Sequence, residues 1–269
     1  MKRFLIYMEV TSVISIPVLK KNIMEFVRLW SVVTVVLLVS LVFLIGTYAP
    51  DGKALIMETT FGDGITDHSL NGILGTCFFE WILSLVPFAY VILAAAELAA
   101  GGLESGELSW IMSAPTKRKR ILFTQSYFLG ISLFSMFFLT AVTGLICGFV
   151  LQPQHFEAAG FILLCLGGFC LHFCLGGAAM LISCLGSDKA VAVVTAAGVP
   201  AFFFVLRQLA KIGGIFLYLN YATVFSLYRA DDVLDGGIFF AWKYPFLLLT
   251  GVILYWVSMQ IFEKRDLPL

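Results

Sequence analysis

Long apolar stretches separated by short polar segments dominate the chain. A helix needs about 20 mostly apolar residues to cross the roughly 30 Å of hydrocarbon in a bilayer. The first such stretch, residues 29–48, carries no charged side chain. The pattern predicts an all-α integral membrane protein, a single transmembrane domain over residues 1–269. Its six transmembrane helices are expected at about 29–48, 76–99, 121–151, 159–185, 190–206 and 244–262.

Basic residues are distributed unequally between the two ends of these helices. Six spans place both termini on the same side, and most of the 17 Lys and Arg residues fall on that side, including the cluster at 117–120. Positive charge accumulates in cytoplasmic loops. We therefore expect a multi-pass protein of the plasma membrane with both termini in the cytoplasm.

Composition narrows the class of protein. The chain is 60% hydrophobic and 13% charged, whereas soluble domains carry about 25% charged residues. Its formal net charge is zero, so no basic field is available to hold nucleic acid. These values exclude a cytosolic enzyme and a nucleic-acid binder, and they make membrane lipid the expected surroundings.

The six cysteines all lie in apolar runs, where a free cysteine behaves as a small hydrophobe. Cys170, His172 and Cys174 are close in sequence, but residues two apart point to different sides of a helix. No second pair of ligands is nearby. We therefore expect no metal site.

Paired glycines interrupt the fourth span at 167–168 and 176–177. Small residues allow membrane helices to approach closely. The fourth span is therefore expected at an interface between helices.

A short amphipathic segment, residues 20–30, precedes the first span. Pro17 stands before it and marks the expected break ahead of the segment. Charged and apolar side chains fall on opposite faces, which predicts an elbow helix in the membrane interface that leads into the first span. The charged face holds Lys21, Glu25 and Arg28, and the apolar face holds Ile23, Val27 and Trp30.

Residues 207–243, between the fifth and sixth spans, mix charged and aromatic side chains. Irregular backbone at membrane depth is tolerated only where it is buried in protein or lines a wet cavity. We therefore expect short re-entrant helices before the sixth span. The basic residues at its start could pair with the aspartates downstream, or could meet an anionic group of a substrate, and pairing is favoured. The candidate outer gate consists of Arg207, Lys211, Asp231 and Asp232, with Asp235 as a further acid.

Glu80 and Glu97 stand on either side of Pro87 in the second span. If this span is centred near Phe88, both acids lie close to the membrane interfaces, where a charge costs far less than at the bilayer centre. We expect both to act as interfacial anchors. The alternative is that Glu97 helps to orient the segment that follows.

That segment, residues 104–122, reads ESGELSWIMSAPTKRKRIL. Glu104 is suited to the positive end of a helix dipole, and Pro115 would end the helix. A short cytoplasmic helix is therefore expected between the second and third spans. The basic cluster that follows it is typical of positive-inside anchoring.

The spacing within this segment resembles the cytoplasmic loop of the ABC type-2 exporter permeases, the membrane subunits of bacterial ATP-binding-cassette transporters. Two positions depart from the family pattern, because Glu107 replaces the usual Thr and Gln125 replaces the usual Lys. The C-terminal FEKRDLPL also resembles the end of family members. The matching residues are Glu104, Gly106, Leu108, Ser113, Pro115, Arg118 and Ile121.

The resemblance implies a permease that exports an amphipathic or hydrophobic substrate, such as an antimicrobial peptide, a drug or a lipid-like molecule. Residues 104–115 would form a coupling helix that docks on the ATPase, with the elbow (Lys21, Glu25 and Arg28) as a second contact. The coupling residues carried over from the family or adjoining its motif are Glu104, Gly106, Glu107, Leu108, Pro115 and Arg118.

The chain has no phosphate-binding loop, since Gly52-Lys53 is followed by Ala54 and lacks the earlier glycine. ATP would then be hydrolysed by a separate subunit that binds ATP and Mg²⁺, and no cofactor or enzymatic activity is expected in this chain. The family arrangement implies two ATPase copies and a second permease, in a homodimer or a heterodimer.

Two other classes remain as alternatives. A secondary, ion-coupled transporter would need acids near the bilayer midplane and matching interrupted helices in two halves. An intramembrane enzyme would need a nucleophile with a base, or a metal set, at one depth. The sequence shows neither arrangement, and its three histidines are scattered.

Overall fold

A computed structural model describes residues 14–48, 69–101, 118–186, 188–210, 223–228, 230 and 242–264. This part of the chain is almost entirely helical and contains no strand. Six helical runs within it are long and apolar enough to cross a membrane, which confirms the predicted number of spans and the all-α class. The six runs are Ile16–Gly46, Leu70–Gly101, Lys119–Leu151, Ala158–Leu185, Lys189–Ala210 and Lys243–Lys264.

The spans correspond to a larger set of helical elements, because the second span changes its helical geometry along its length. It is built from two α-helices, α4 and α5, and two π-helices, η2 and η3. A short 3₁₀ helix, η5, lies between the last two spans. The elements are α2 (Ile16–Gly46), α4 (Leu70–Ile73), η2 (Leu74–Ile82), α5 (Leu83–Ala96), η3 (Glu97–Gly101), α8 (Arg118–Leu151), α9 (Ala158–Leu185), α10 (Lys189–Ala210), η5 (Val224–Leu227) and α12 (Lys243–Lys264).

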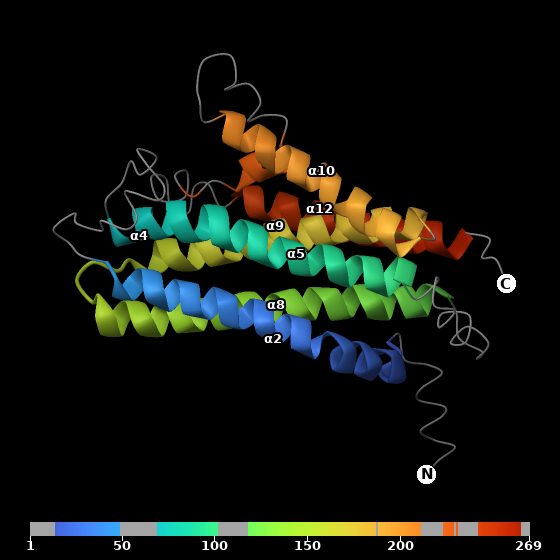
Figure 1. Cartoon of the computed structure of the whole chain (residues 1–269), viewed down its shortest axis with the longest axis horizontal. Helices are drawn as coiled ribbons and strands as arrows, with labels where there is room; N and C mark the ends of the chain where they lie inside the picture. The colour runs from blue at the N-terminus through green and yellow to red at the C-terminus, as the bar shows by residue number, and fades with distance from the viewer. Residues whose placement is uncertain are drawn as a thin grey trace, which may run out of the picture.

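The long helices form an elongated bundle in which the first turns of α2 and the last turns of α12 lie at the same end (Figure 1). The end of the second span and the beginnings of α8 and α10 lie there too. We call this the inner end, because it is the end predicted to face the cytoplasm, and the opposite one the outer end.

Helix α9 is the centre of the bundle, with contacts to α12, α8, α5 and α10. Its glycines make close contacts with neighbouring helices, as the sequence predicted. A Cβ atom placed on Gly177 would lie 2.9 Å from the main-chain oxygen of Gly251 in α12. The two backbones can approach this closely only because neither residue has a side chain.

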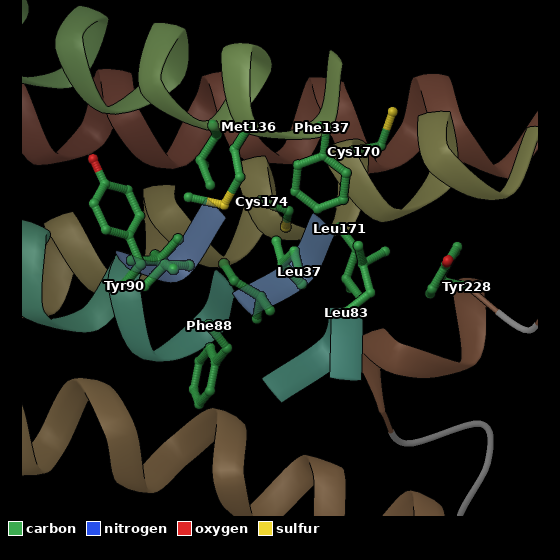
Figure 2. Packing of buried hydrophobic residues seen from close by; sticks show 14 of the residues in the cluster. Leu37, Leu83, Phe88, Tyr90, Met136, Phe137, Cys170, Leu171, Cys174 and Tyr228 are labelled. Atoms are coloured by element: carbon green, nitrogen blue, oxygen red, sulfur yellow. The ribbon is translucent and has the colours of Figure 1, made fainter. Parts of the chain in front are cut away.

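The apolar core is assembled by side chains from all six spans. Leu37 of α2, Leu83 of α5, Met136 of α8 and Leu171 of α9 converge in it, and each is completely buried (Figure 2). All six cysteines are free, and five of them are buried, as expected of small hydrophobic side chains.

The first span differs from its prediction. Helix α2 runs without a break from Ile16 to Gly46, so the predicted elbow is the first part of the spanning helix itself. Lys21 and Glu25 form an ion pair of 3.5 Å on the predicted charged face. Trp30 does not share the exposed apolar face of Ile23 and Val27, because its Nε1–H donates to the main-chain oxygen of Ser132 in α8 at 3.0 Å.

The second span begins earlier than predicted. The hydroxyl of Ser69 accepts a hydrogen bond from the main-chain N–H of Gly72 at 3.0 Å, which caps the helix at this point. From Leu70 the helical run continues to Gly101, a length of 32 residues. Glu80 consequently lies well inside the helix and not near its end. This position decides what Glu80 can contact.

Candidate functional site

The sequence-predicted site residues are only partly covered by the described structure. Most of the coupling segment and most of the candidate gate lie outside it: Glu104, Gly106, Glu107, Leu108, Pro115, Lys211, Asp231 and Asp232. Arg118 is the first residue of α8. Lys21, Glu25 and Arg28 lie in the first half of α2. Arg207 lies near the end of α10.

Arg207 forms a buried ion pair with Glu80. Its Nη2 donates to Oε1 of Glu80 at 2.7 Å, and the two side chains are only 2% and 8% exposed. Glu80 therefore has a specific partner on the fifth span instead of serving only as an interfacial anchor. Within the described residues Arg207 thus pairs with an acid, Glu80 of η2. The expected partners Asp231, Asp232 and Asp235 lie outside those residues, so that pairing stays a prediction.

Aromatic side chains lie close to this pair. Trp81 packs edge-on against Phe204 with 5.8 Å between ring centroids, and Phe204 in turn packs against Phe225 of η5 at 5.7 Å. The hydroxyl of Tyr228 donates to the main-chain oxygen of Leu164 in α9 at 3.1 Å. Burial raises the pKa of Tyr228 well above its usual value, so the phenol stays neutral and remains a donor. Apolar surroundings strengthen the charge–charge attraction between Glu80 and Arg207.

The guanidinium of Arg207 is not fully satisfied. Its Nη1 is buried and has no hydrogen-bond partner among the residues that the structure describes. A buried donor without a partner costs free energy that water would recover. This donor stays unsatisfied while the pair is buried, and exposure of the pair to water would satisfy it. The arrangement therefore suits a contact that can open.

A second pair joins the same two spans at the inner end. Lys189 at the start of α10 contacts the carboxylate of Glu97 in η3, and both side chains are nearly half exposed. The carboxyl group of Glu97 lies over Gly101, where a Cβ atom would come within 2.8 Å of Oε1. Glu97 thus has a specific partner on the fifth span instead of serving only as an anchor.

The two helices that border the 102–117 connection are tied together. The side-chain amide of Gln125 in α8 donates to the main-chain oxygen of Leu98 in η3 at 2.8 Å, and Gln125 is buried. Glutamine suits this buried position. A lysine here would have to bury an ammonium group, which is far more costly than burying an amide that makes a hydrogen bond.

The predicted elbow is fastened to the same region. The main-chain N–H of Ser15 donates to Oγ1 of Thr124 at 3.0 Å, and Nη2 of Arg120 donates to the main-chain oxygen of Ile14 at 3.1 Å. Phe26 packs against Phe128 with 5.7 Å between ring centroids. The first turns of α2 and α8 therefore form one packed unit at the base of the 102–117 connection.

Replacing Gln125 tests this tie. We expect Gln125→Leu to lower the free energy of unfolding by about 1 kcal/mol, the usual value of one hydrogen bond, and Gln125→Lys to lower it further. Denaturant titration of the purified chain in detergent measures both. Gln152→Leu is the matched control, because the Gln152 amide donates to the Tyr48 main-chain oxygen over a longer 3.2 Å at the outer end. If Gln125→Lys has the same free energy of unfolding as the unmodified chain, the Gln125 contact does not hold α8 to η3.

His172 belongs to α9, lies in the interior of the bundle and contacts α5 as well as its own helix. Its Nδ1 is 2.8 Å from the main-chain oxygen of Gly168, and its Nε2 is 3.3 Å from that of Ser84. Ser84 stands three residues before Pro87. His172 thus supports the second span beside its proline.

Comparison with models of known protein families finds no match, and comparison with curated proteins finds none either. The candidate site therefore rests on the residues of this chain. Sequence reasoning found Arg207 but missed Glu80 as its partner and Lys189 as that of Glu97. The sequence did contain a signal for both pairs. Glu80 and Glu97 are about as far apart along the chain as Lys189 and Arg207, and this similar spacing allows both pairs to form between two antiparallel helices.

Proposed function

We propose that the chain is the membrane-spanning permease subunit of an ATP-binding-cassette exporter. It moves an amphipathic or hydrophobic substrate out of the cell, using ATP hydrolysed by a separate subunit. The observation that carries the proposal is the exporter-like pattern at 104–122, in the connection between the second and third of six spans.

The geometry at the inner end supports this proposal. A segment that receives force from an ATPase must stand on a base that does not deform. Gln125 holds α8 to η3 beside the connection, and Arg120 holds α8 to the start of α2. A third contact joins Lys119 of α8 to Glu263 of α12 at 3.6 Å. A force on the connection would therefore be transmitted through α8 to η3, to the start of α2 and to α12.

The proposal requires partners. Two ATPase copies, which bind ATP and Mg²⁺, and a second permease copy complete the transporter, and the residues at 104–115 with Arg118 form the docking surface. Lys21, Glu25 and Arg28 supply the second contact from the first part of α2.

Copurification and ATP turnover test the coupling role. We expect the full-length chain, isolated from its native membrane, to bring down a nucleotide-hydrolysing subunit of the ATP-binding-cassette type. Joint charge reversal at Glu104, Glu107 and Arg118 should reduce both the copurified ATPase and the ATP turnover of the complex severalfold. Unchanged binding and turnover in that variant would show that this segment does not couple to an ATPase.

Glu157→Lys provides the matched control for that variant. Glu157 is an exposed residue between α8 and α9, at the outer end (Figure 1), and its reversal changes the formal net charge by the same amount as the triple variant. ATPase binding and turnover should be unaffected. A loss equal to that of the triple variant would assign the effect to net charge and not to docking.

Ion-coupled secondary transport is the second candidate, and one observation favours it. Ionisable groups inside a membrane bundle commonly mark ion or proton pathways, and Glu80, Arg207 and His172 are all buried within this one. Substrate uptake into vesicles that contain the purified chain alone, driven by a proton gradient without ATP, would establish this class and exclude the first.

A further inference from the structure

The second and fifth spans are joined by two ion pairs of different character. Glu80–Arg207 is buried, whereas Glu97–Lys189 is nearly half exposed. Both acids belong to the second span and both bases to α10, as two antiparallel neighbours require. An exposed pair is screened by water and contributes little stability, whereas a buried pair strongly resists the loss of either partner.

The inner end of α10 is held close to its neighbours. Helix α9 ends at Leu185 and α10 begins at Lys189, so only residues 186–188 connect them. The carboxylate of Asp188 accepts a hydrogen bond from the main-chain N–H of Ala190 at 2.8 Å and caps the new helix. Ala192 then packs on Ala96 and Ala100 in a small cluster of its own. Such short side chains allow one helix to tilt on another without a clash.

The outer end of α10 is arranged differently. It stands away from α9 and α12 (Figure 1), and η5 packs against both α10 and α12. The long side chains of Glu80 and Arg207 bridge from the second span to this part of α10. Only 17% of the most apolar stretch of α10 is buried, against 33% or more for every other span.

We propose that α10 is a hinged helix that turns about its inner end, and that the Glu80–Arg207 pair is the latch that holds its outer end closed. The inference rests on the permease function proposed above and assigns that function its outer gate. Glu80 and Arg207 form this gate, and α10 is the part that moves.

The physical chemistry of the pair suits a latch. In the closed state, apolar and aromatic neighbours keep water away, so the attraction between the two charges is strong. Once water enters, each ion is hydrated separately and the unpartnered Nη1 of Arg207 gains a hydrogen bond. The closed state, in which the charges are paired, and the open state, in which both are hydrated, are thus each favourable. A half-open state, in which the charges are neither paired nor hydrated, is not.

Two native cysteines report on the latch. Cys77 lies in η2, one turn before Glu80, and Cys165 follows Leu164, which accepts the hydrogen bond of Tyr228. Both thiols are buried in the closed structure. Opening of the outer end of α10 would bring water, and a water-soluble thiol reagent, to this region.

The test is labelling of the full-length chain in membrane vesicles by a membrane-impermeant maleimide, added to each face in turn and located by peptide mass spectrometry. We expect Glu80→Gln to raise the labelling rate of Cys77 or Cys165 about tenfold, which corresponds to a closed state weakened by 1.4 kcal/mol. The increase should appear from one face only. Glu97→Gln, which loosens the inner pair, is the matched control and should leave the rate unchanged.

Each outcome decides the proposal. Unchanged labelling in Glu80→Gln, or an equal increase in Glu97→Gln, would overturn it. Cys174 and Cys184 serve as internal controls, because both are buried on α9 away from the latch. If they are labelled too, Glu80→Gln has unfolded the chain, and the milder Glu80→Asp is judged by the same criteria. If the labelling is as expected but the chain has no ATPase partner, the hinge stands and only the proposed permease function is overturned.

Discussion

Glu80→Met is expected to destabilise the chain by about 3–5 kcal/mol, the loss usually seen when one partner of a buried ion pair is removed. The reason is that Arg207 is 2% exposed and its guanidinium cannot lose its proton to escape the apolar surroundings. Arg207→Met is expected to cost less, because the remaining carboxyl group can become neutral by taking up a proton. The free energy of unfolding in detergent measures both.

The double variant, Glu80→Met with Arg207→Met, separates the need for a partner from the need for charge. A buried ion pair replaced by apolar side chains of similar volume is commonly neutral or even stabilising. We therefore expect the double variant to recover most of the stability that Glu80→Met loses. If the losses of the single variants simply add, the two residues do not act as a pair.

Gly177→Val should produce the second large loss, at least about 1–3 kcal/mol, as is typical of an overfilled core. Its Cβ would meet the main-chain oxygen of Gly251 at 2.9 Å and the Cβ of Leu254 at 2.9 Å. Because a main-chain atom cannot turn aside, α9 and α12 would have to separate. Thermal unfolding followed by tryptophan fluorescence measures the effect.

Gly198→Val is the matched control, since a Cβ atom on Gly198 in α10 meets nothing within 4 Å. Valine has a better helix propensity than glycine by a few tenths of a kcal/mol, so this variant should be as stable as the original chain or slightly more stable. Equal destabilisation at the two positions would mean that α9 and α12 do not pack as closely as their glycines suggest.

The spans could be predicted from the sequence because hydrophobic length is a local property that needs no knowledge of neighbours. The glycine pairs of α9 were equally informative, since small residues have few other uses in a spanning helix. The partner of Arg207 could not be predicted in this way. Glu80 lies 127 residues away in sequence, and only the packing of α10 against the second span brings the two together.

The position of Glu80 within the second span shows a limit of hydropathy. The apolar pattern predicts a span from about residue 76, but the helical run starts at Leu70 and is 32 residues long. The cap at Ser69 sets this earlier start, and the π-helical turns of η2 follow it. Hydropathy does not detect either feature, because both depend on hydrogen bonds rather than on apolar surface. The aspartates expected to pair with Arg207 lie outside the described residues, so that part stays a prediction.

The pairing of α2 with α8 bears on how the chain is made. The first span packs chiefly against the third, so its principal partner does not exist when it leaves the ribosome. It must stay in the lipid alone while the second span is synthesised. Its mean hydropathy of 2.7 is the highest of the six, which allows it to remain inserted unaided. The helix with the highest mean hydropathy is thus the one that must remain in the membrane longest before its main partner is synthesised.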